Sequence, residues 1–164
     1  DIKKLVTGII GNSGEKQNLI LMDNNVLASS RFDAIIDDIK TLGFKKGATF
    51  GPTKRKRIVD FNQGLDARLL NEKKMKRLAE IPLEPMRLAF DSISMKKAYV
   101  EAVRLANAYG QKETSNYILY NYDDGPADFY ERMRINIELN EEFKSTPTRT
   151  SIYSFPHEIH STER

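Results

Sequence analysis

The amino-acid sequence predicts an α/β fold, in which short strands and helices alternate along a single domain of 164 residues. Nearly all-apolar segments of strand length recur about every 30 to 40 residues, which is close to the length of a βα unit. The segments between them carry apolar residues at helical spacing. Because strands that are apolar throughout are typical of parallel sheets with both faces covered, we expect a parallel sheet of about five strands.

The first half of the chain contains two expected strands, each followed by a helix. Residues 18–22 form an apolar run that ends in turn-forming residues. Apolar residues follow at helical spacing over 32–42, and a glycine comes next as a suitable helix end. A second strand is expected at 57–61, and Asn71 is placed to cap the helix after it.

The second half repeats this pattern. A third strand is expected at 87–90, followed by a helix over 95–109. A fourth strand at 116–120 leads to the pair Gly125-Pro126, which opens another helix because proline is favoured in the first turn. Residues 151–155 read as a fifth strand.

Composition excludes several classes of protein. The chain is 40% hydrophobic and 30% charged, which is ordinary for a globular protein, and no apolar run approaches the ~20 residues of a membrane span. No signal peptide is visible, so we expect a cytoplasmic protein with no membrane partner. The chain has no cysteine, which rules out disulfides, thiolate zinc sites and cysteine-held iron–sulfur clusters within it.

Polar residues follow every expected strand. Right-handed crossovers place the carboxyl ends of parallel strands on one edge of the sheet, where functional groups gather in such folds. Five strands are too few for the usual eight-stranded barrel, so the sheet is either open or a piece of something larger. The strand-end residues are Asp23, Asn24, Asn25, Asn62, Gln63, Asp66, Arg68, Asp91, Asn121, Asp123, Asp124 and the segment 155–157.

Four segments of the chain resemble one family in order and in length. They read LMDNNVLAS at 21–29, VDFNQGLDARLL at 59–70, RLAFD at 87–91 and SNYILYNYDDGPADFYERMRINIELN at 115–140. Together they resemble the later part of a group of bacterial radical S-adenosylmethionine (radical SAM) proteins, most of which have no assigned substrate. The resemblance covers roughly residues 19 to 155.

The resemblance implies a partial (βα)6 barrel of the TIM-barrel type. Radical SAM enzymes hold a [4Fe-4S] cluster on a CxxxCxxC loop after their first strand, and they cleave S-adenosyl-L-methionine reductively to a 5′-deoxyadenosyl radical that abstracts hydrogen from a substrate. This chain has no cysteine, and its first convincing strand matches the family's second. We therefore interpret residues 1–164 as the C-terminal portion of such a barrel, inactive alone and without bound cofactor, with the activity belonging to the intact parent.

The resemblance also implies roles for residues after the first two expected strands. Asp23, Asn24 and Asn25 stand where family members contact the methionine amino group, and their oxygens are suitable acceptors for an ammonium. The alternative is an Asx turn. After the next strand come Asn62, Gln63 and Arg68. A bidentate pair between this arginine and the methionine carboxylate is one prediction, and a pair with the nearby Asp66 is the other.

Further roles follow for the later strands. Arg87 and Asp91 bracket the strand where the family meets the ribose or the carboxylate, although Asp91 could equally cap the next helix. Asn116, Tyr120 and Asn121 surround the strand whose end holds the adenine, and a tyrosine packed in the core is the alternative there. Phe155-Pro156 would close the adenine pocket or belong to the core.

Two other functions remain open from the residues themselves. The basic residues Lys45, Lys46 and 54–57 could bind RNA phosphates, or they form a solvated loop. A complete, cysteine-free βα barrel that binds a phosphorylated metabolite is the third reading. In the truncated-barrel reading, exposed sheet edges would favour self-association.

Overall fold

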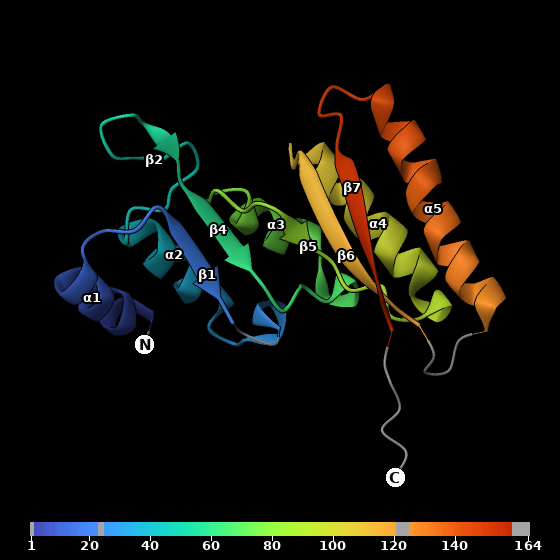
Figure 1. Cartoon of the computed structure of the whole chain (residues 1–164), viewed down its shortest axis with the longest axis horizontal. Coiled ribbons are helices and arrows are strands. Elements are labelled where there is room, and N and C mark those ends of the chain that lie inside the picture. Colours follow the sequence, from blue (N-terminus) through green and yellow to red (C-terminus); the bar gives the residue numbers. More distant parts are fainter. Residues whose placement is uncertain (1, 23–24, 121–124, 159–164) are drawn as a thin grey trace, which may run out of the picture.

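The computed structural model describes residues 2–22, 25–120 and 125–158, and its elements alternate as an α/β fold requires (Figure 1). The α-helices in this part of the chain are α1 (Ile2–Ser13), α2 (Phe32–Thr41), α3 (Glu72–Leu78), α4 (Lys96–Ala108) and α5 (Pro126–Lys144). The strands are β1 (Asn18–Leu21), β2 (Thr49–Phe50), β3 (Arg55–Lys56), β4 (Ile58–Phe61), β5 (Met86–Arg87), β6 (Glu113–Tyr120) and β7 (Ser151–Glu158).

Parallel pairing joins the main strands in the order in which the chain makes them. β1 pairs with β4, and β5, β6 and β7 form a second parallel group. Single parallel bridges, Val59 to Leu83 and Leu65 to Leu88, link the β4 segment to the β5 segment. The predicted α/β class with parallel strands is therefore confirmed.

The helices cover one face of these strands. Figure 1 shows α2, α3 and α4 behind the strands, with α5 beside β7. Leu19 and Val59 are register partners that point into this helix side and are buried. The next pair, Ile20 and Asp60, points to the opposite face, where Ile20 is 59% exposed.

The opposite side of the strands, which we call the open face, carries exposed apolar side chains on β6 and β7 as well. Tyr117 pairs in register with Phe155, and Tyr153 lies beside Ser115. The exposed fractions are 43% for Tyr117, 51% for Tyr153 and 48% for Phe155. The prediction that both faces are covered is thus wrong for the described part of the chain, because helices pack on one face only.

The outer edge of β7 is partly closed by a side chain. Asn140 of α5 donates from Nδ2 to the carbonyl oxygen of Ile152 at 3.1 Å and accepts from the Ile152 N–H at 2.8 Å. The main-chain N–H and C=O groups of successive strand residues point alternately to the two edges of a strand, so the main-chain groups of Ser154 and Pro156 face the same outer edge as those of Ile152. Pro156 has no N–H to offer there.

Two elements were not expected from the sequence. Helix α1 contains two glycines and buries no residue completely, so its signal was weak. The hairpin of β2 and β3 lies in the basic segment, which lacks the apolar alternation that predicts strands. Strand β5 is also shorter than predicted, because after Arg87 the chain leaves the regular ladder and continues through the bridge at Leu88.

No helix in the described ranges combines the length and apolarity needed to cross a bilayer.

Candidate functional site

The segment after β4 forms a tight turn that directs polar residues to the carboxyl edge of the strands. The N–H of Gly64 donates to the carbonyl oxygen of Phe61 at 2.9 Å, and Gly64 has a φ of +86°. A β-carbon there would lie 3.9 Å from the Arg87 carbonyl oxygen, an ordinary contact, so the positive φ is what favours glycine. The turn returns Leu65 to β5, where its N–H donates to the Arg87 carbonyl at 2.8 Å.

A pocket at this edge, which we call the rim pocket, gathers residues from the ends of three successive parallel strands. Its volume is about 220 Å³. Asn25 comes from the segment after β1, Gln63 and Arg68 follow β4, and Asp91 follows β5. The remaining lining residues are Gly64, Leu65, Asp66, Ala89 and Met95. Four of the residues predicted to bind the cofactor therefore lie together.

Arg68 is held by its neighbour Asp66. Its Nε and Nη2 donate to the two carboxylate oxygens of Asp66 at 3.0 and 2.8 Å, and its backbone N–H donates to the same carboxylate at 2.9 Å. The side-chain hydrogen bonds from Arg68 lower the pKa of the Asp66 carboxyl. Of the two predicted pairings, the one with Asp66 is present. The Arg68 side chain is 65% exposed, which leaves its remaining N–H groups accessible from the pocket.

Asp91 is the acidic group of the rim pocket whose environment disfavours ionisation. Loss of hydration raises the pKa of its carboxyl, although the residue remains accessible to water. The positive charges of Arg132 and Arg68 oppose this rise, and the negative charge of Asp66 adds to it. Arg132 is fully buried beneath and donates from Nη1 to the Phe90 carbonyl at 2.8 Å. Perturbed carboxyls in pockets are typical of binding or catalytic positions.

Arg87 lies away from the rim pocket, on the open face. Its Nε and Nη2 donate to the two oxygens of Asp60, both at 2.8 Å, and its Nη1 lies 3.5 Å from the Ser115 hydroxyl. The bond to Asp60 raises the pKa of Arg87. The bidentate side of the guanidinium is thus occupied by Asp60, and only the remaining N–H groups of Nη1 and Nη2 can donate to a further group. Sequence reasoning missed Asp60, although an acid within an apolar strand was a usable signal.

Asn62 also lies near the open face. Its backbone N–H extends the β1–β4 ladder by donating to the Leu21 carbonyl at 3.0 Å, and its side-chain amide lies 3.5 Å from the sulfur of Met22. Asn62 therefore does not line the rim pocket.

Asn116 points to the helix side rather than to the site. Its amide nitrogen donates to the Tyr99 hydroxyl at 2.5 Å, and that hydroxyl donates to Asn136 of α5 at 2.9 Å. All three residues are buried. Asp23, Asn24 and Asn121 lie outside the described residues, and Tyr120 is described only as the last backbone position of β6.

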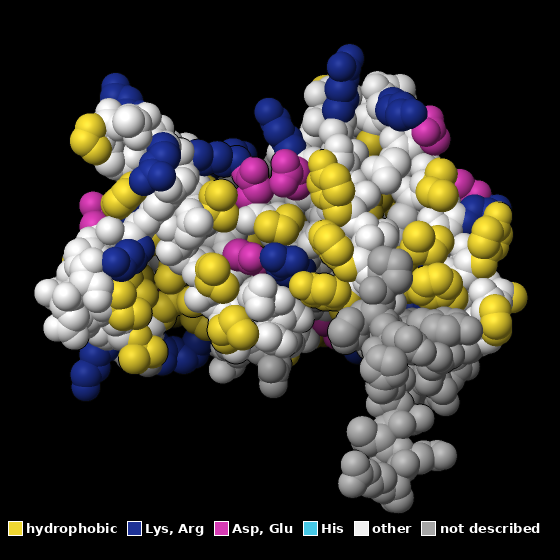
Figure 2. Space-filling model, in the orientation of Figure 1, with side chains coloured by type: hydrophobic (Ala, Val, Ile, Leu, Met, Phe, Trp, Pro, Cys, Tyr) yellow, Lys and Arg dark blue, Asp and Glu magenta, His cyan; other side chains and the backbone are white. Residues whose placement is uncertain are grey.

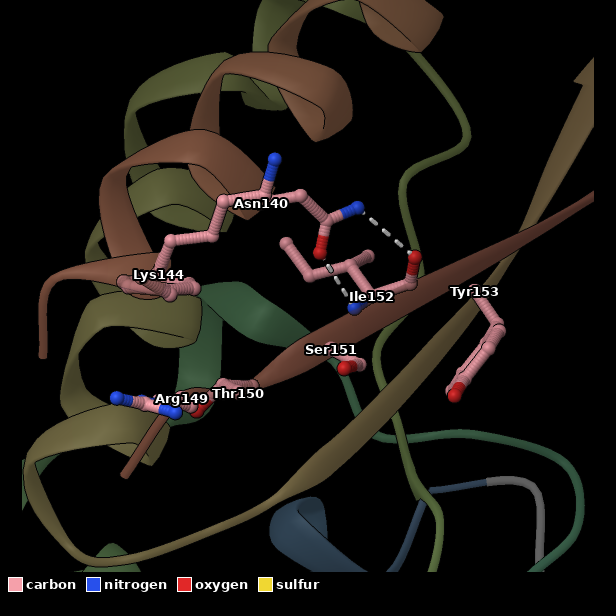
Figure 3. A pocket seen from close by; sticks show the side chains of 8 residues that line it. Asn140, Lys144, Arg149, Thr150, Ser151, Ile152 and Tyr153 are labelled. Carbon is pink, nitrogen blue, oxygen red and sulfur yellow. Dashed lines mark hydrogen bonds between the residues drawn. The ribbon is translucent and has the colours of Figure 1, made fainter. Parts of the chain in front are cut away.

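A larger hollow than the rim pocket lies elsewhere, between the C-terminal end of α5 and the start of β7 (Figure 3). It measures about 590 Å³, and Lys144, Arg149 and Tyr153 are among its walls. Figure 3 shows Asn140 turned to the backbone of Ile152 rather than into free space. This hollow lies at the amino end of β7, so it does not contain the carboxyl-edge residues.

The rim pocket offers suitable groups for the amino-acid end of S-adenosylmethionine. Asp91 and the oxygen of Asn25 can accept from an ammonium, and Arg68 and the Gln63 amide can donate to a carboxylate. Its volume is below the ~300 Å³ at which small-molecule sites usually begin, so it suits part of such a ligand.

A [4Fe-4S] cluster does not fit this chain, which has no cysteine. Within the described ranges, no three His, Asp or Glu side chains form a metal-binding group.

Comparisons with protein-family models, with curated proteins and with solved structures found no match to this chain.

Proposed function

We propose that this chain is the S-adenosylmethionine-binding part of a radical SAM enzyme, and that its parallel strands belong to a partial barrel. The observation that carries the proposal is the rim pocket, where polar side chains from three successive strand ends meet. Such convergence at the carboxyl edge is typical of ligand sites in parallel α/β folds.

The order of the strands supports a barrel over a doubly wound sheet. In doubly wound sheets the strand order reverses, and helices cover both faces. Here β1, β4, β5, β6 and β7 follow chain order through their ladders and bridges, and none of the described helices covers the open face. In a barrel, this face would turn inward, which suits the Asp60–Arg87 pair and the aromatic side chains beside it.

The exposed surface where α1 meets β1 is consistent with an additional strand of the barrel beside β1. The Leu21 carbonyl faces β4, so the backbone groups of Ile20 face the free edge of β1. Leu5 and Ile9 of α1 are 68% and 52% exposed. A parallel strand beside β1, joined through α1 by a right-handed crossover, would use this edge and cover these side chains.

The rim pocket assigns roles to its residues. Asp91 and Asn25 would accept from the methionine ammonium, while Gln63 and the exposed nitrogens of Arg68 would donate to the carboxylate. If a [4Fe-4S] cluster held outside this chain supplied one electron, the bound S-adenosylmethionine would be cleaved to methionine and a 5′-deoxyadenosyl radical, which would abstract hydrogen from the substrate. The residues described here would bind and orient the ligand.

Calorimetric titration with S-adenosylmethionine tests the rim pocket. From the sequence alone, no cofactor is expected on this fragment, but because the rim pocket lies wholly within the chain, we now expect weak binding by the wild type. Gln63→Ala/Asp91→Asn should lower the affinity about tenfold or more, since charge-assisted hydrogen bonds contribute about 1.5–3 kcal/mol. Glu101→Gln, on the exposed surface of α4, is the control and should bind as the wild type does. Equal affinity in the double variant would contradict the assignment.

The activity itself is tested on the intact parent. The gene upstream of the Asp1 codon should encode a CxxxCxxC segment in the same frame. The parent, reconstituted anaerobically with iron, sulfide and S-adenosylmethionine, should release 5′-deoxyadenosine. A start codon immediately before Asp1, or no such release, would count against the radical SAM proposal.

A further inference from the structure

The basic segment that precedes β4 divides into structural and accessible charges. Arg57 is buried between Phe44 and Phe50, with its guanidinium carbon 4.7 and 5.5 Å from the ring centres, and it pairs with Glu15. Because this arginine is enclosed and paired, it fixes the hairpin and is not available to a ligand. Lys56 is paired as well, through Glu84.

The other cations of this segment face solvent. Lys54 and Arg55 lie on the β2–β3 hairpin, which extends from the body of the molecule in Figure 1. Arg55 lies over the half-buried ring of Phe50, at 5.8 Å. Lys45 and Lys46 are exposed just before the hairpin. Among the described ion pairs, none joins these four cations to a carboxylate.

A hollow next to the hairpin continues this basic surface. It measures about 290 Å³ and has Lys46, Lys56 and Lys112 among its walls. Ile81, Pro82, Leu83 and Tyr109 give it apolar walls, and Glu84 and Glu113 are its acidic groups. Beyond it, the 590 Å³ hollow adds Lys144, which pairs with Glu141, and the exposed Arg149.

All these cations lie at the amino ends of the parallel strands. The hairpin precedes β4, Lys112 precedes β6 and Arg149 precedes β7, where the Ser151 N–H donates to the Lys112 carbonyl at 2.8 Å. Figure 2 shows Lys and Arg side chains in a row along the upper edge of the molecule, interrupted by acidic side chains near the middle. We call this row the basic edge. The rim pocket lies at the opposite ends of the strands.

We propose that the basic edge binds single-stranded nucleic acid. A row of exposed cations suits a linear polyanion, since each phosphate can meet a separate lysine or arginine. Between the cations lie two hollows with apolar or aromatic walls, including Tyr109 and the half-exposed Tyr153. A polymer that alternates phosphates with flat bases can use both features, because bases pack on apolar and aromatic surfaces in a sequence-tolerant way.

Fluorescence anisotropy with a labelled single-stranded RNA of about 20 nucleotides tests the proposal. We expect binding by the wild-type chain at low salt, and a loss of about fivefold or more in Lys54→Gln/Lys112→Gln. The slope of log affinity against log salt should become shallower by about 1.4, or 0.7 for each phosphate contact removed. Thermal unfolding should be unchanged, since neither lysine side chain pairs with a carboxylate in the described structure.

The charge-matched control is Lys73→Gln/Lys97→Gln. Both lysines are exposed in the first turns of α3 and α4, at the opposite ends of the strands. This control has the same net charge as Lys54→Gln/Lys112→Gln, but it should bind RNA within about twofold of the wild type. Equal losses in the two variants would show a net-charge effect and overturn the proposal, as would wild-type binding to phosphatidylserine vesicles but not to RNA.

The proposal is independent of the rim pocket. Asp91→Asn should leave RNA binding unchanged, and Lys54→Gln/Lys112→Gln should leave S-adenosylmethionine binding unchanged. Coupled losses in these two measurements would contradict the separation of the sites.

Discussion

Tyr99 connects three elements of the core through one hydroxyl group. It accepts from Asn116 of β6 and donates to Asn136 of α5, and its ring stacks on Phe90 with centres 4.1 Å apart. Burial raises the pKa of this hydroxyl, so it remains protonated and able to donate. Asn136 in turn donates to Ser154 of β7 at 2.7 Å.

Removal of that hydroxyl takes the hydrogen-bond partner from two buried atoms, the amide nitrogen of Asn116 and the amide oxygen of Asn136. We expect Tyr99→Phe to lower the free energy of unfolding by about 1–3 kcal/mol, the cost of unsatisfied buried polar groups. Urea denaturation measures this change. Tyr130→Phe, at a position that is 70% exposed on α5, is the control and should change stability little. A neutral Tyr99→Phe would contradict the network.

The carboxyl of Asp91 should make stability depend on pH in an unusual direction. Its folded-state pKa is raised, so its stabilising contribution is present below the ordinary value of 3.8 and is lost as pH rises through the folded pKa. Asp91→Asn removes that loss. We expect the urea midpoint of the variant to exceed that of the wild type near pH 7 and to match it near pH 3.

Asp66→Asn provides the opposite case. The pKa of Asp66 is lowered by Arg68, so its contribution is present above 3.8 and is lost as pH falls through the folded pKa. The variant should be less stable than the wild type near pH 7, and the difference should vanish in acid. The same sign of change in both variants would contradict these assignments.

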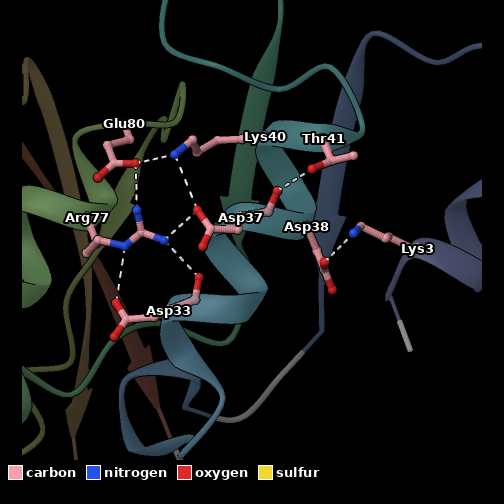
Figure 4. A network of polar contacts seen from close by, with 8 residues as sticks. All are labelled: Lys3, Asp33, Asp37, Asp38, Lys40, Thr41, Arg77 and Glu80. Carbon is pink, nitrogen blue, oxygen red and sulfur yellow. Dashed lines mark hydrogen bonds and ion pairs between the residues drawn. The ribbon is translucent and has the colours of Figure 1, made fainter.

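At the scale of elements, Arg77 joins α3 to α2 through several carboxylates (Figure 4). Its guanidinium donates to Asp37 at 2.7 Å, to Glu80 at 2.7 Å and to Asp33 at 3.1 Å. Lys40 also reaches Glu80, at 2.5 Å. The bond to Arg77 lowers the pKa of Asp37, and Lys40, followed by Arg77, lowers the pKa of Glu80.

We expect Arg77→Gln to destabilise the fold by about 1 kcal/mol near neutral pH, since a network of surface ion pairs contributes more to stability than an isolated pair does. The carboxylates contribute above their ordinary pKa values of 3.8 and 4.5, so the difference should disappear as pH falls through the lowered values. Arg104→Gln breaks the isolated pair with Glu142 and should cost less. Thermal denaturation against pH distinguishes these outcomes.

The turn after β4 gives a second test at this scale. Gly64→Ala should cost about 1–2 kcal/mol, because the left-handed conformation is unfavourable for residues with a β-carbon. Gly8→Ala, within α1 and with nothing within 4 Å of the added carbon, should instead stabilise by about 0.5–1 kcal/mol. A neutral change at Gly64 in chemical denaturation would refute the strain argument.

At the scale of the whole molecule, the open face predicts self-association. Ile20, Tyr117 and Phe155 expose apolar side chains on one side of the strands, and such surfaces favour burial between copies. We expect sedimentation velocity to show a concentration-dependent increase in apparent mass, which Ile20→Lys should reduce. Ile137→Lys, on the exposed side of α5, is the control. A wild-type chain that stays monomeric at high concentration would contradict this prediction.

The sequence predicted the strand positions and the rim residues better than the faces of the strands. Apolar runs and turn residues locate strand ends, so Asn25, Gln63 and Asp91 could be grouped in advance. Arg87 and Asn116 looked alike, since each lies in a strand near polar neighbours. The register of β5 and β6, set by long-range pairing, places them on opposite faces. Helix α1 and the hairpin likewise depend on tertiary contacts rather than on local pattern.

The amide of Asn140 makes the two outer edges of the strands unequal. It bonds both the N–H and the C=O of Ile152, which are the groups that an additional strand would need in order to pair with β7 at that point. Of the two outer edges, the edge of β1 beside Ile20 is therefore the more favourable for pairing with a further strand. A parallel strand paired with β1 would end close to Asn25. The loop after that strand would then form a wall of the small cavity that contains Asp91.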